Sequence, residues 1–232
     1  CYGAMYVSNY IGLILTQLIS ILKGSPVTNT MLEVATSSNL WVNLFIMVLC
    51  APVAEELIFR KLLIDRLAQY GEGVAVLFSG LMFGLFHGNL NQFVYAFVLG
   101  LCFGFIYVKT GNIRYTIGLH MLVNFLGSVL GVAILKWLGD DFLSIASDPA
   151  GMMSYMTGNF GKLIVYFIYI FLLLGVAIAG IILFIVNLKK IRFLPGMNTL
   201  PKGKRFSTTV LNVGMALYMI VWIVIIIVQL FQ

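Results

Sequence analysis

Three charged side chains lie together in an otherwise apolar stretch, APVAEELIFR. Glu55 and Glu56 are adjacent, and Arg60 follows Glu56 by four residues, so on a helix Glu56 and Arg60 face each other and can form an ion pair. Glu55 is rotated by about 100° from Glu56 and has no local cation on its own face. Pro52 precedes this acid and removes one backbone hydrogen bond, which favours a kink and open space beside it. Glu55 is therefore the first candidate for a functional side chain.

Both histidines of the chain, His87 and His120, also lie in apolar runs. His87 ends the stretch FGLFH, and His120 begins HMLVN, in which Asn124 projects from the same helix face as His120. A single buried histidine is usually a satisfied core residue. Here both histidines of the chain lie in apolar runs, and the same chain has a buried acid pair, which together favour a functional site.

The spacing predicts that these groups lie at one depth. Lys61 and Arg114 mark the inner ends of two apolar runs, and Glu55 and His120 each lie six residues from one of them. At about 1.5 Å per residue, each sits about 9 Å inside. The hairpin that leads from Glu55 to His87 turns near its midpoint, so His87 returns to the same level.

A carboxylate and an imidazole that share a water can act as a general base and generate a hydroxide-like nucleophile. A second imidazole and an amide can donate hydrogen bonds to an oxyanion. These are the parts needed to hydrolyse an amide by direct attack of water, and no serine or cysteine shows a nucleophile arrangement such as GxSxG. We expect no cofactor. Zinc held by Glu55, His87 and His120 is the alternative, although the HExxH spacing is absent.

The composition places these groups in a membrane protein. Hydrophobic residues make up 61% of 232 and charged residues 9%, with a mean hydropathy of +1.04, whereas soluble domains carry about 25% charge. The net charge of +6 comes from basic residues at the ends of apolar runs. That distribution concerns membrane orientation and predicts no nucleic-acid partner. Three cysteines form no disulfide framework.

Seven apolar runs predict an all-α, polytopic helical membrane protein with about seven to eight transmembrane helices, since about 20 apolar residues cross a bilayer. An N-terminal segment before Cys1 would supply the eighth. We expect one intramembrane domain, residues 1–232, with a motif core at 41–130 and extra C-terminal helices at 162–231. The runs are 4–22, 41–67, 74–87, 93–108, 113–138, 163–188 and 209–230.

Two loops predict the orientation. Residues 189–205 carry Lys189, Lys190, Arg192, Lys202, Lys204 and Arg205 without an acid, and residues 139–161 carry Asp140, Asp141 and Asp148 with no base. The basic loop should therefore be cytoplasmic and the acidic loop should lie opposite. The run after His87 should begin on the outer side. Either the third helix continues past His87, or GNLN, residues 88–91, forms a polar turn within the protein.

Glycines spaced four residues apart share a helix face and let a neighbouring helix approach closely. We expect this close packing at Gly80 and Gly84, Gly100 and Gly104, and Gly127 and Gly131.

The three motifs EELIFR, FGLFH and HMLVN fit EExxxR, FxxxH and HxxxN, in that order and on successive apolar runs. The sequence between residues 55 and 124 thus resembles the CAAX protease and bacteriocin-processing family of intramembrane endopeptidases, which includes the type II CAAX prenyl endopeptidases. Any one motif is weak, whereas three in order that use both histidines are specific.

The resemblance implies a role for each motif position. Glu55 and His87 would bind and activate water, and His120 and Asn124 would stabilise the oxyanion. Glu56 and Arg60 would support the site by charge pairing. It also implies a site open to the cytosolic side of the cell membrane, and a membrane-associated peptide or protein as substrate.

Two other functions use the same residues. A non-proteolytic relative would act as a bacteriocin-immunity protein or membrane chaperone with an idle site. A proton-coupled transporter would use Glu55, His87 and His120 as a relay, although transporters usually show internal repeats and broken helices that this sequence lacks. A purely structural polar core is the third alternative.

Overall fold

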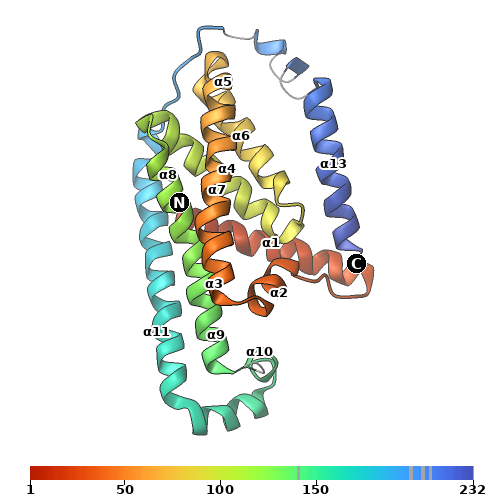
Figure 1. Cartoon of the computed structure of the whole chain (residues 1–232), viewed down its shortest axis with the longest axis vertical. Coiled ribbons are helices and arrows are strands. Elements are labelled where there is room, and N and C mark those ends of the chain that lie inside the picture. Colours follow the sequence, from red (N-terminus) through yellow and green to blue (C-terminus); the bar gives the residue numbers. More distant parts are fainter. Residues whose placement is uncertain (140–141, 199–200, 205–206, 209–210, 232) are drawn as a thin grey trace.

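The computed structural model describes residues 1–139, 142–198, 201–204, 207–208 and 211–231, and within these ranges it is helical and contains no strand (Figure 1). The all-α prediction is therefore confirmed. The α-helices are α1 Tyr2–Lys23, α2 Thr30–Ser37, α3 Leu40–Val42, α4 Ala51–Glu56, α5 Asp65–Leu67, α6 Glu72–Phe86, α7 Leu90–Thr110, α8 Ile113–Asn124, α9 Val132–Leu138, α10 Phe142–Ile145, α11 Pro149–Asn187 and α13 Val213–Leu230. Short 3₁₀ turns occupy Ala68–Tyr70, Leu188–Lys190 and Lys202–Lys204.

Six continuous helical segments of the described chain are long and apolar enough to cross a membrane. They are Tyr2–Lys23, Leu40–Tyr70, Leu90–Thr110, Ile113–Leu138, Pro149–Lys190 and Val213–Leu230. The remaining run, predicted at 74–87, is the 15-residue helix α6, which ends at Phe86. Gly88 then takes a left-handed φ of 65°, and the Asn89 side chain accepts from the backbone N–H of Gln92 at 2.8 Å to start α7. GNLN is thus a polar turn within the protein.

The helix that carries the acid pair is widened on both sides of α4. Residues Asn43–Cys50 and Leu57–Ile64 are π-helical, a geometry that is rare and often found at functional sites. The backbone N–H of Ala51 donates to Ile46 O, five residues back, and Pro52 has no N–H to give. The carbonyl of Met47 is consequently left without a hydrogen-bond donor in its own helix. The effect of Pro52 is therefore to leave this carbonyl available to a donor from another helix.

Helices α6 and α7 form the tightest hairpin of the fold. A Cβ on Gly100 would lie 2.8 Å from the Cα of Gly80, and one on Gly84 would lie 2.9 Å from the Cβ of Phe97. These positions need glycine because backbone and Cβ atoms already fill the space. The prediction fails at Gly127, where a Cβ would meet no neighbouring atom within 4 Å.

Helix α1 crosses the other long helices transversely, in contrast to the upright α11 and α13 (Figure 1). It packs on α7 and α11 through a face of small residues that are buried, Gly3, Ser8, Gly12 and Thr16. Because these residues are small, the helices they face can come close. Many of its larger apolar side chains, such as Ile11, Ile14 and Leu18, are exposed.

The basic segment after α11 lies at the same end of the bundle as the corner between α5 and α6. The backbone N–H of Leu194 donates to the Glu72 carboxylate at 2.8 Å, and Lys109 forms an ion pair with the same carboxylate. The backbone N–H of Asn198 donates to Gln69 O at 2.9 Å. These contacts hold the basic segment beside the α5–α6 corner. Asp140, Asp141, Arg205 and Thr209 lie outside the described residues.

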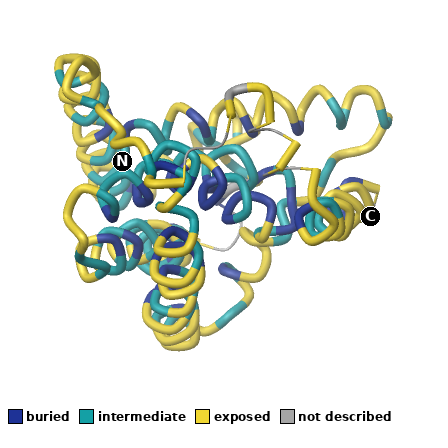
Figure 2. Tube along the Cα trace, turned by 90° about the horizontal axis from the view of Figure 1, so that it is seen from above, coloured by how far each residue is buried: buried dark blue, intermediate teal, exposed yellow. Residues whose placement is uncertain are grey.

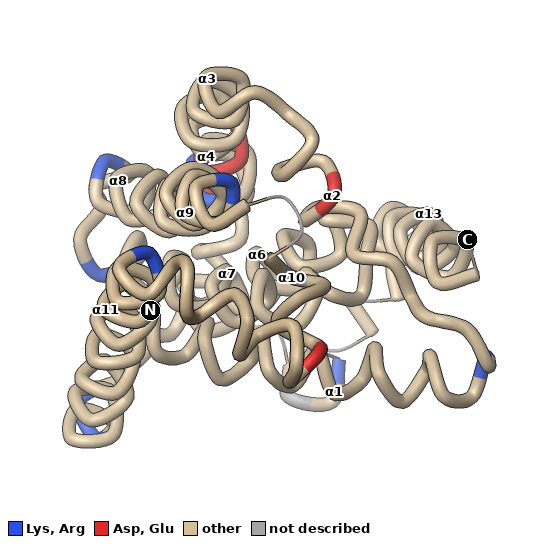
Figure 3. Tube along the Cα trace, turned by 90° about the horizontal axis from the view of Figure 1, so that it is seen from below, with Lys and Arg blue, Asp and Glu red and all other residues tan. Residues whose placement is uncertain are grey.

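Buried segments gather in the middle of the bundle and exposed ones surround them (Figure 2). The exposed positions of the long helices are mostly large and apolar, as expected where lipid replaces water. Charged residues are few, and acidic segments lie at α4, at α2 and at one further place on the chain (Figure 3). Two of the largest fully buried side chains of the described chain are Arg60 and Glu56, so the centre of this membrane protein is ionic.

Candidate active site

The predicted ion pair between Glu56 and Arg60 is present and fully buried. Arg60 Nε lies 3.0 Å from Glu56 Oε2 and Arg60 Nη2 lies 3.3 Å from Glu56 Oε1, a two-point contact. Arg60 Nη1 donates to the Ser79 hydroxyl at 2.6 Å, and that hydroxyl donates to Phe59 O at 2.8 Å. The guanidinium also lies 4.9 Å from the centre of the Phe83 ring. These contacts fix Glu56 in one position.

His120 lies between the two carboxylates. Its Nδ1 is 3.1 Å from Glu56 Oε1, and its Nε2 is 3.6 Å from Glu55 Oε2. The ring packs between Phe83 and Phe103 and is 3% exposed. Because an ionised carboxylate only accepts hydrogen bonds, the hydrogen on Nδ1 is directed at Glu56 and Nε2 is left to face Glu55. Glu56 therefore orients His120 as well as pairing with Arg60, a link that the sequence did not predict.

His87 follows the last residue of α6, where the chain turns at Gly88. Its Nδ1 lies 2.8 Å from Phe83 O, and since a carbonyl only accepts, Nδ1 carries the hydrogen. The ring packs edge-on against Phe83, with the ring centres 4.9 Å apart. This leaves Nε2 as the unprotonated nitrogen of the neutral ring, which is the form that a general base requires.

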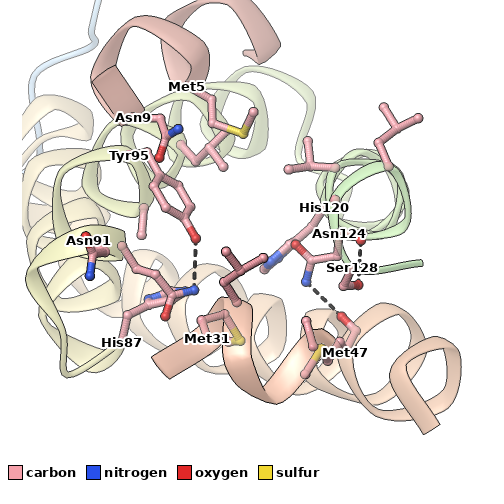
Figure 4. A pocket seen from close by; sticks show the side chains of 18 of the residues that line it. Met5, Asn9, Met31, Met47, His87, Asn91, Tyr95, His120, Asn124 and Ser128 are labelled. Carbon is pink, nitrogen blue, oxygen red and sulfur yellow. Dashed lines mark hydrogen bonds between the residues drawn. The ribbon is translucent and has the colours of Figure 1, made fainter. Parts of the chain in front are cut away.

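Asn124, at the end of α8, is partly engaged. Its Nδ2 donates to Met47 O at 2.8 Å (Figure 4), which is the carbonyl that the π-helical segment and Pro52 leave without a partner. The amide nitrogen has a second hydrogen, so one donor remains. Asn124 thus joins α8 to the helix of the acid pair and keeps limited capacity for a ligand.

Four of the six predicted site residues line one cavity of about 470 Å³. Glu55 reaches it from α4. His87 reaches it from the end of α6, and His120 and Asn124 reach it from α8 (Figure 4). Glu56 and Arg60 do not line it and lie behind His120, where they support the wall. The volume falls in the range of small-ligand pockets, and the lining is mainly apolar with convergent polar groups.

Sequence reasoning missed the polar residues that α1 and α7 contribute to this cavity. Asn9, Asn91, Gln92 and Tyr95 all line it, and Asn91 and Gln92 are buried. The signal was available, because Asn91 and Gln92 stand four and five residues after His87, immediately before an apolar run. Its meaning depends on the turn at Gly88, which brings the start of α7 back to the depth of the histidines.

The zinc alternative names Glu55, His87 and His120 as the ligands. Among the described residues, no three His, Cys, Asp or Glu side chains are grouped closely enough to hold a metal ion. His120 Nδ1 is directed at Glu56, so only its Nε2, which lies 3.6 Å from Glu55 Oε2, is left to face Glu55. A reaction without metal remains a proposal.

A Glu–Arg pair behind two histidines and an amide, around a cavity inside apolar helices, is the arrangement that the resemblance to membrane-embedded CAAX proteases implied. Residues 37–126 match the family described as type II CAAX prenyl endopeptidase Rce1-like, and this confirms the resemblance inferred from the three motifs.

Two curated relatives show similarity over parts of the chain. The chain is 26% identical over 153 residues to the membrane-embedded CAAX protease MroQ of Staphylococcus aureus (strain USA300), covering 63% of this chain and 59% of that protein. It is 32% identical over 74 residues to the putative membrane peptidase YdiL of Bacillus subtilis (strain 168), covering 32% of this chain and 30% of that protein. The chain thus spans less than two thirds of either relative. No solved structure matches it.

Proposed function

We propose that the protein is an intramembrane endopeptidase that hydrolyses a peptide bond with water activated by Glu55 and His87. One observation carries the proposal: Glu55, His87 and His120 line a single cavity, while the second nitrogen of each imidazole is held by Phe83 O or by Glu56. The orientation of each imidazole ring is therefore fixed beside Glu55 in the wall of the cavity. A packing or ion-pair role explains Glu56 and Arg60 but gives no reason for Glu55.

The reaction needs no group beyond these side chains and one water. The water oxygen attacks the carbonyl carbon, and Glu55 takes the proton while His87 Nε2 accepts the second water hydrogen bond. The carbonyl oxygen becomes an oxyanion, which Asn124 and His120 stabilise. The carbon–nitrogen bond then breaks, and Glu55 returns the proton to the leaving amine. The products are a carboxylic acid and an amine.

Donation from His120 carries a condition. Its Nδ1 hydrogen is directed at Glu56, so a hydrogen bond from Nε2 to the oxyanion requires the doubly protonated ring. The neutral ring cannot serve, because its Nε2 is an acceptor. Glu55 and Glu56 lie on either side of the ring, and two neighbouring carboxylates favour its positively charged form.

We also propose that the site works near the cytoplasmic face of the cell membrane, on a membrane-associated peptide or protein. The basic segment after α11 supports this orientation, since it meets the corner of α5 and α6 at one end of the bundle. The relatives named as a CAAX protease and a putative membrane peptidase support the substrate class. The lipid-facing helices would let such a substrate enter from the bilayer.

The test compares the protein with Glu55→Gln in proteoliposomes, using a set of quenched-fluorescent peptides with and without a farnesylated cysteine. Mass spectrometry of membrane peptides from cells with and without the protein supplies further sequences. We expect Glu55→Gln to lower turnover by about 10²- to 10⁴-fold, the usual loss for a general base, with insertion and purification unchanged. Near-normal turnover of Glu55→Gln would remove this mechanism, and solute uptake without cleavage would favour the transporter alternative.

A further inference from the structure

Asn89, Gln92 and Tyr95 form a directional chain of hydrogen bonds at the start of α7. The Asn89 side-chain oxygen accepts from the backbone N–H of Gln92 at 2.8 Å, so its Nδ2 must be the end that meets Gln92 Oε1 at 2.6 Å. Gln92 Nε2 is then the end that meets the Tyr95 hydroxyl, at 2.8 Å. Since one backbone N–H fixes both amide orientations, Tyr95 accepts from Gln92 and its own hydrogen points elsewhere.

The free hydroxyl hydrogen of Tyr95 has no acceptor among the described residues, and the side chain lines the same cavity as Glu55, His87 and His120 (Figure 4). The Tyr95 ring packs against the buried cluster of Phe59, Phe83 and Ala96. Phe83 also contacts both imidazoles, with ring centres 4.9 Å from His87 and 5.6 Å from His120. Tyr95 and the two histidines thus share one rigid support.

The two side chains proposed above to stabilise the oxyanion already use part of their hydrogen-bonding capacity elsewhere. Asn124 Nδ2 donates one of its two hydrogen bonds to Met47 O, and the Nδ1 hydrogen of His120 is directed at Glu56. Tyr95 adds a donor whose position and direction are set before substrate arrives, which is the property that makes an oxyanion hole effective.

We propose that the Tyr95 hydroxyl donates a hydrogen bond to the oxyanion of the tetrahedral intermediate, and that Asn89 and Gln92 are positioning residues that aim it. The inference rests on the proposed function, because it assigns a donor to that reaction. Tyr95 transfers no proton: its O–H bond stays intact while the carbonyl oxygen gains and then loses its negative charge.

The first test is Tyr95→Phe, assayed with the quenched-fluorescent peptide that the unmodified protein cleaves. Removing one oxyanion donor costs about 10²- to 10³-fold in kcat, and we expect KM to stay within about twofold, since the bond forms mainly in the transition state. A peptide phosphinate, which carries a tetrahedral oxyanion, should lose affinity by the same factor as kcat/KM. The matched control is Tyr218→Phe, which removes a hydroxyl that donates to Met82 O at 2.8 Å outside the cavity.

The second test reverses the direction of the chain with Gln92→Glu. A carboxylate at position 92 still accepts from Asn89, but it would accept the Tyr95 hydrogen instead of donating to the hydroxyl oxygen. The hydrogen would turn away from the cavity, so kcat should fall about as far as in Tyr95→Phe. Combining Gln92→Glu with Tyr95→Phe should add little further loss, because both variants remove the same bond.

The outcomes distinguish a failure of the Tyr95 role from a failure of the proposed endopeptidase function. Loss of activity in Glu55→Gln but not in Tyr95→Phe would overturn the Tyr95 role alone. A Tyr95→Phe variant that loses kcat but binds the phosphinate normally would also overturn it. If the unmodified protein cleaves no peptide, or if Glu55→Gln cleaves normally, the proposed function itself fails.

Discussion

Arg60→Ala should destabilise the protein more than any surface charge deletion, because it breaks the ionic centre on three sides. The change removes a two-point contact to Glu56, a hydrogen bond to Ser79 and a stacked contact on Phe83. Glu56, which is fully buried, would keep its contact with His120 but lose its cation. Breaking one partner of a buried pair costs about 3 to 5 kcal/mol, and we expect a loss of unfolding free energy in that range.

Unfolding in mixed detergent micelles, followed by tryptophan fluorescence, measures this difference. Lys61→Ala is the matched control, since Lys61 is the next residue and pairs with Asp65 at 2.8 Å on an exposed surface, where ion pairs contribute about 0 to 1 kcal/mol. Arg60→Lys should fall between the two, because an ammonium keeps the charge but cannot reproduce the planar fork. A loss below about 1 kcal/mol for Arg60→Ala, equal to that of Lys61→Ala, would show that the pair does not support the fold.

Two further predictions concern the metal alternative and the helix contacts. Protein purified with a chelator should keep its activity and contain no stoichiometric metal by elemental analysis; one equivalent of zinc, with activity lost on stripping and restored by zinc, would contradict this. Gly100→Ala should lower the unfolding free energy by about 1 to 3 kcal/mol, because its Cβ would press on the Gly80 backbone. Gly175→Ala, where no neighbour lies within 4 Å, should be neutral or slightly stabilising in the same micelle titration, and equal losses for both would refute the packing argument.

The parts of the site that follow helix periodicity were predictable from the sequence. The spacing of Glu56 and Arg60 predicts their ion pair, and the residue counts from Lys61 and Arg114 place Glu55 and His120 at one depth. Seven apolar runs predict the helical architecture, since hydropathy in a membrane protein follows the length of the crossing. Their boundaries lie within a few residues of the observed helices except at α11, which begins at Pro149 and not near residue 163.

The contacts between helices were not predictable, because nothing in local spacing determines which side chains of distant segments meet. The bond from His120 to Glu56 joins residues 64 positions apart, and that from Asn124 to Met47 joins residues 77 apart. The transverse course of α1 was likewise not predictable. Its length and apolar character predict a membrane-crossing helix, but its direction depends on which helices pack against Gly3 and Gly12. The position of Tyr95 in the cavity wall could be inferred only once the turn at Gly88 was known.

The π-helical stretch before α4 has a consequence for how this family of sequences can change over time. Met47 O needs an outside donor because the residue five positions later is Pro52, which has no N–H, and Asn124 supplies that donor. Any other residue at position 52 would offer its own N–H to the same carbonyl and compete with the Asn124 amide. We therefore expect the two positions to be epistatic. If Pro52 is replaced, Asn124 is no longer needed as the donor to Met47 O. While Pro52 is present, position 124 must carry a hydrogen-bond donor.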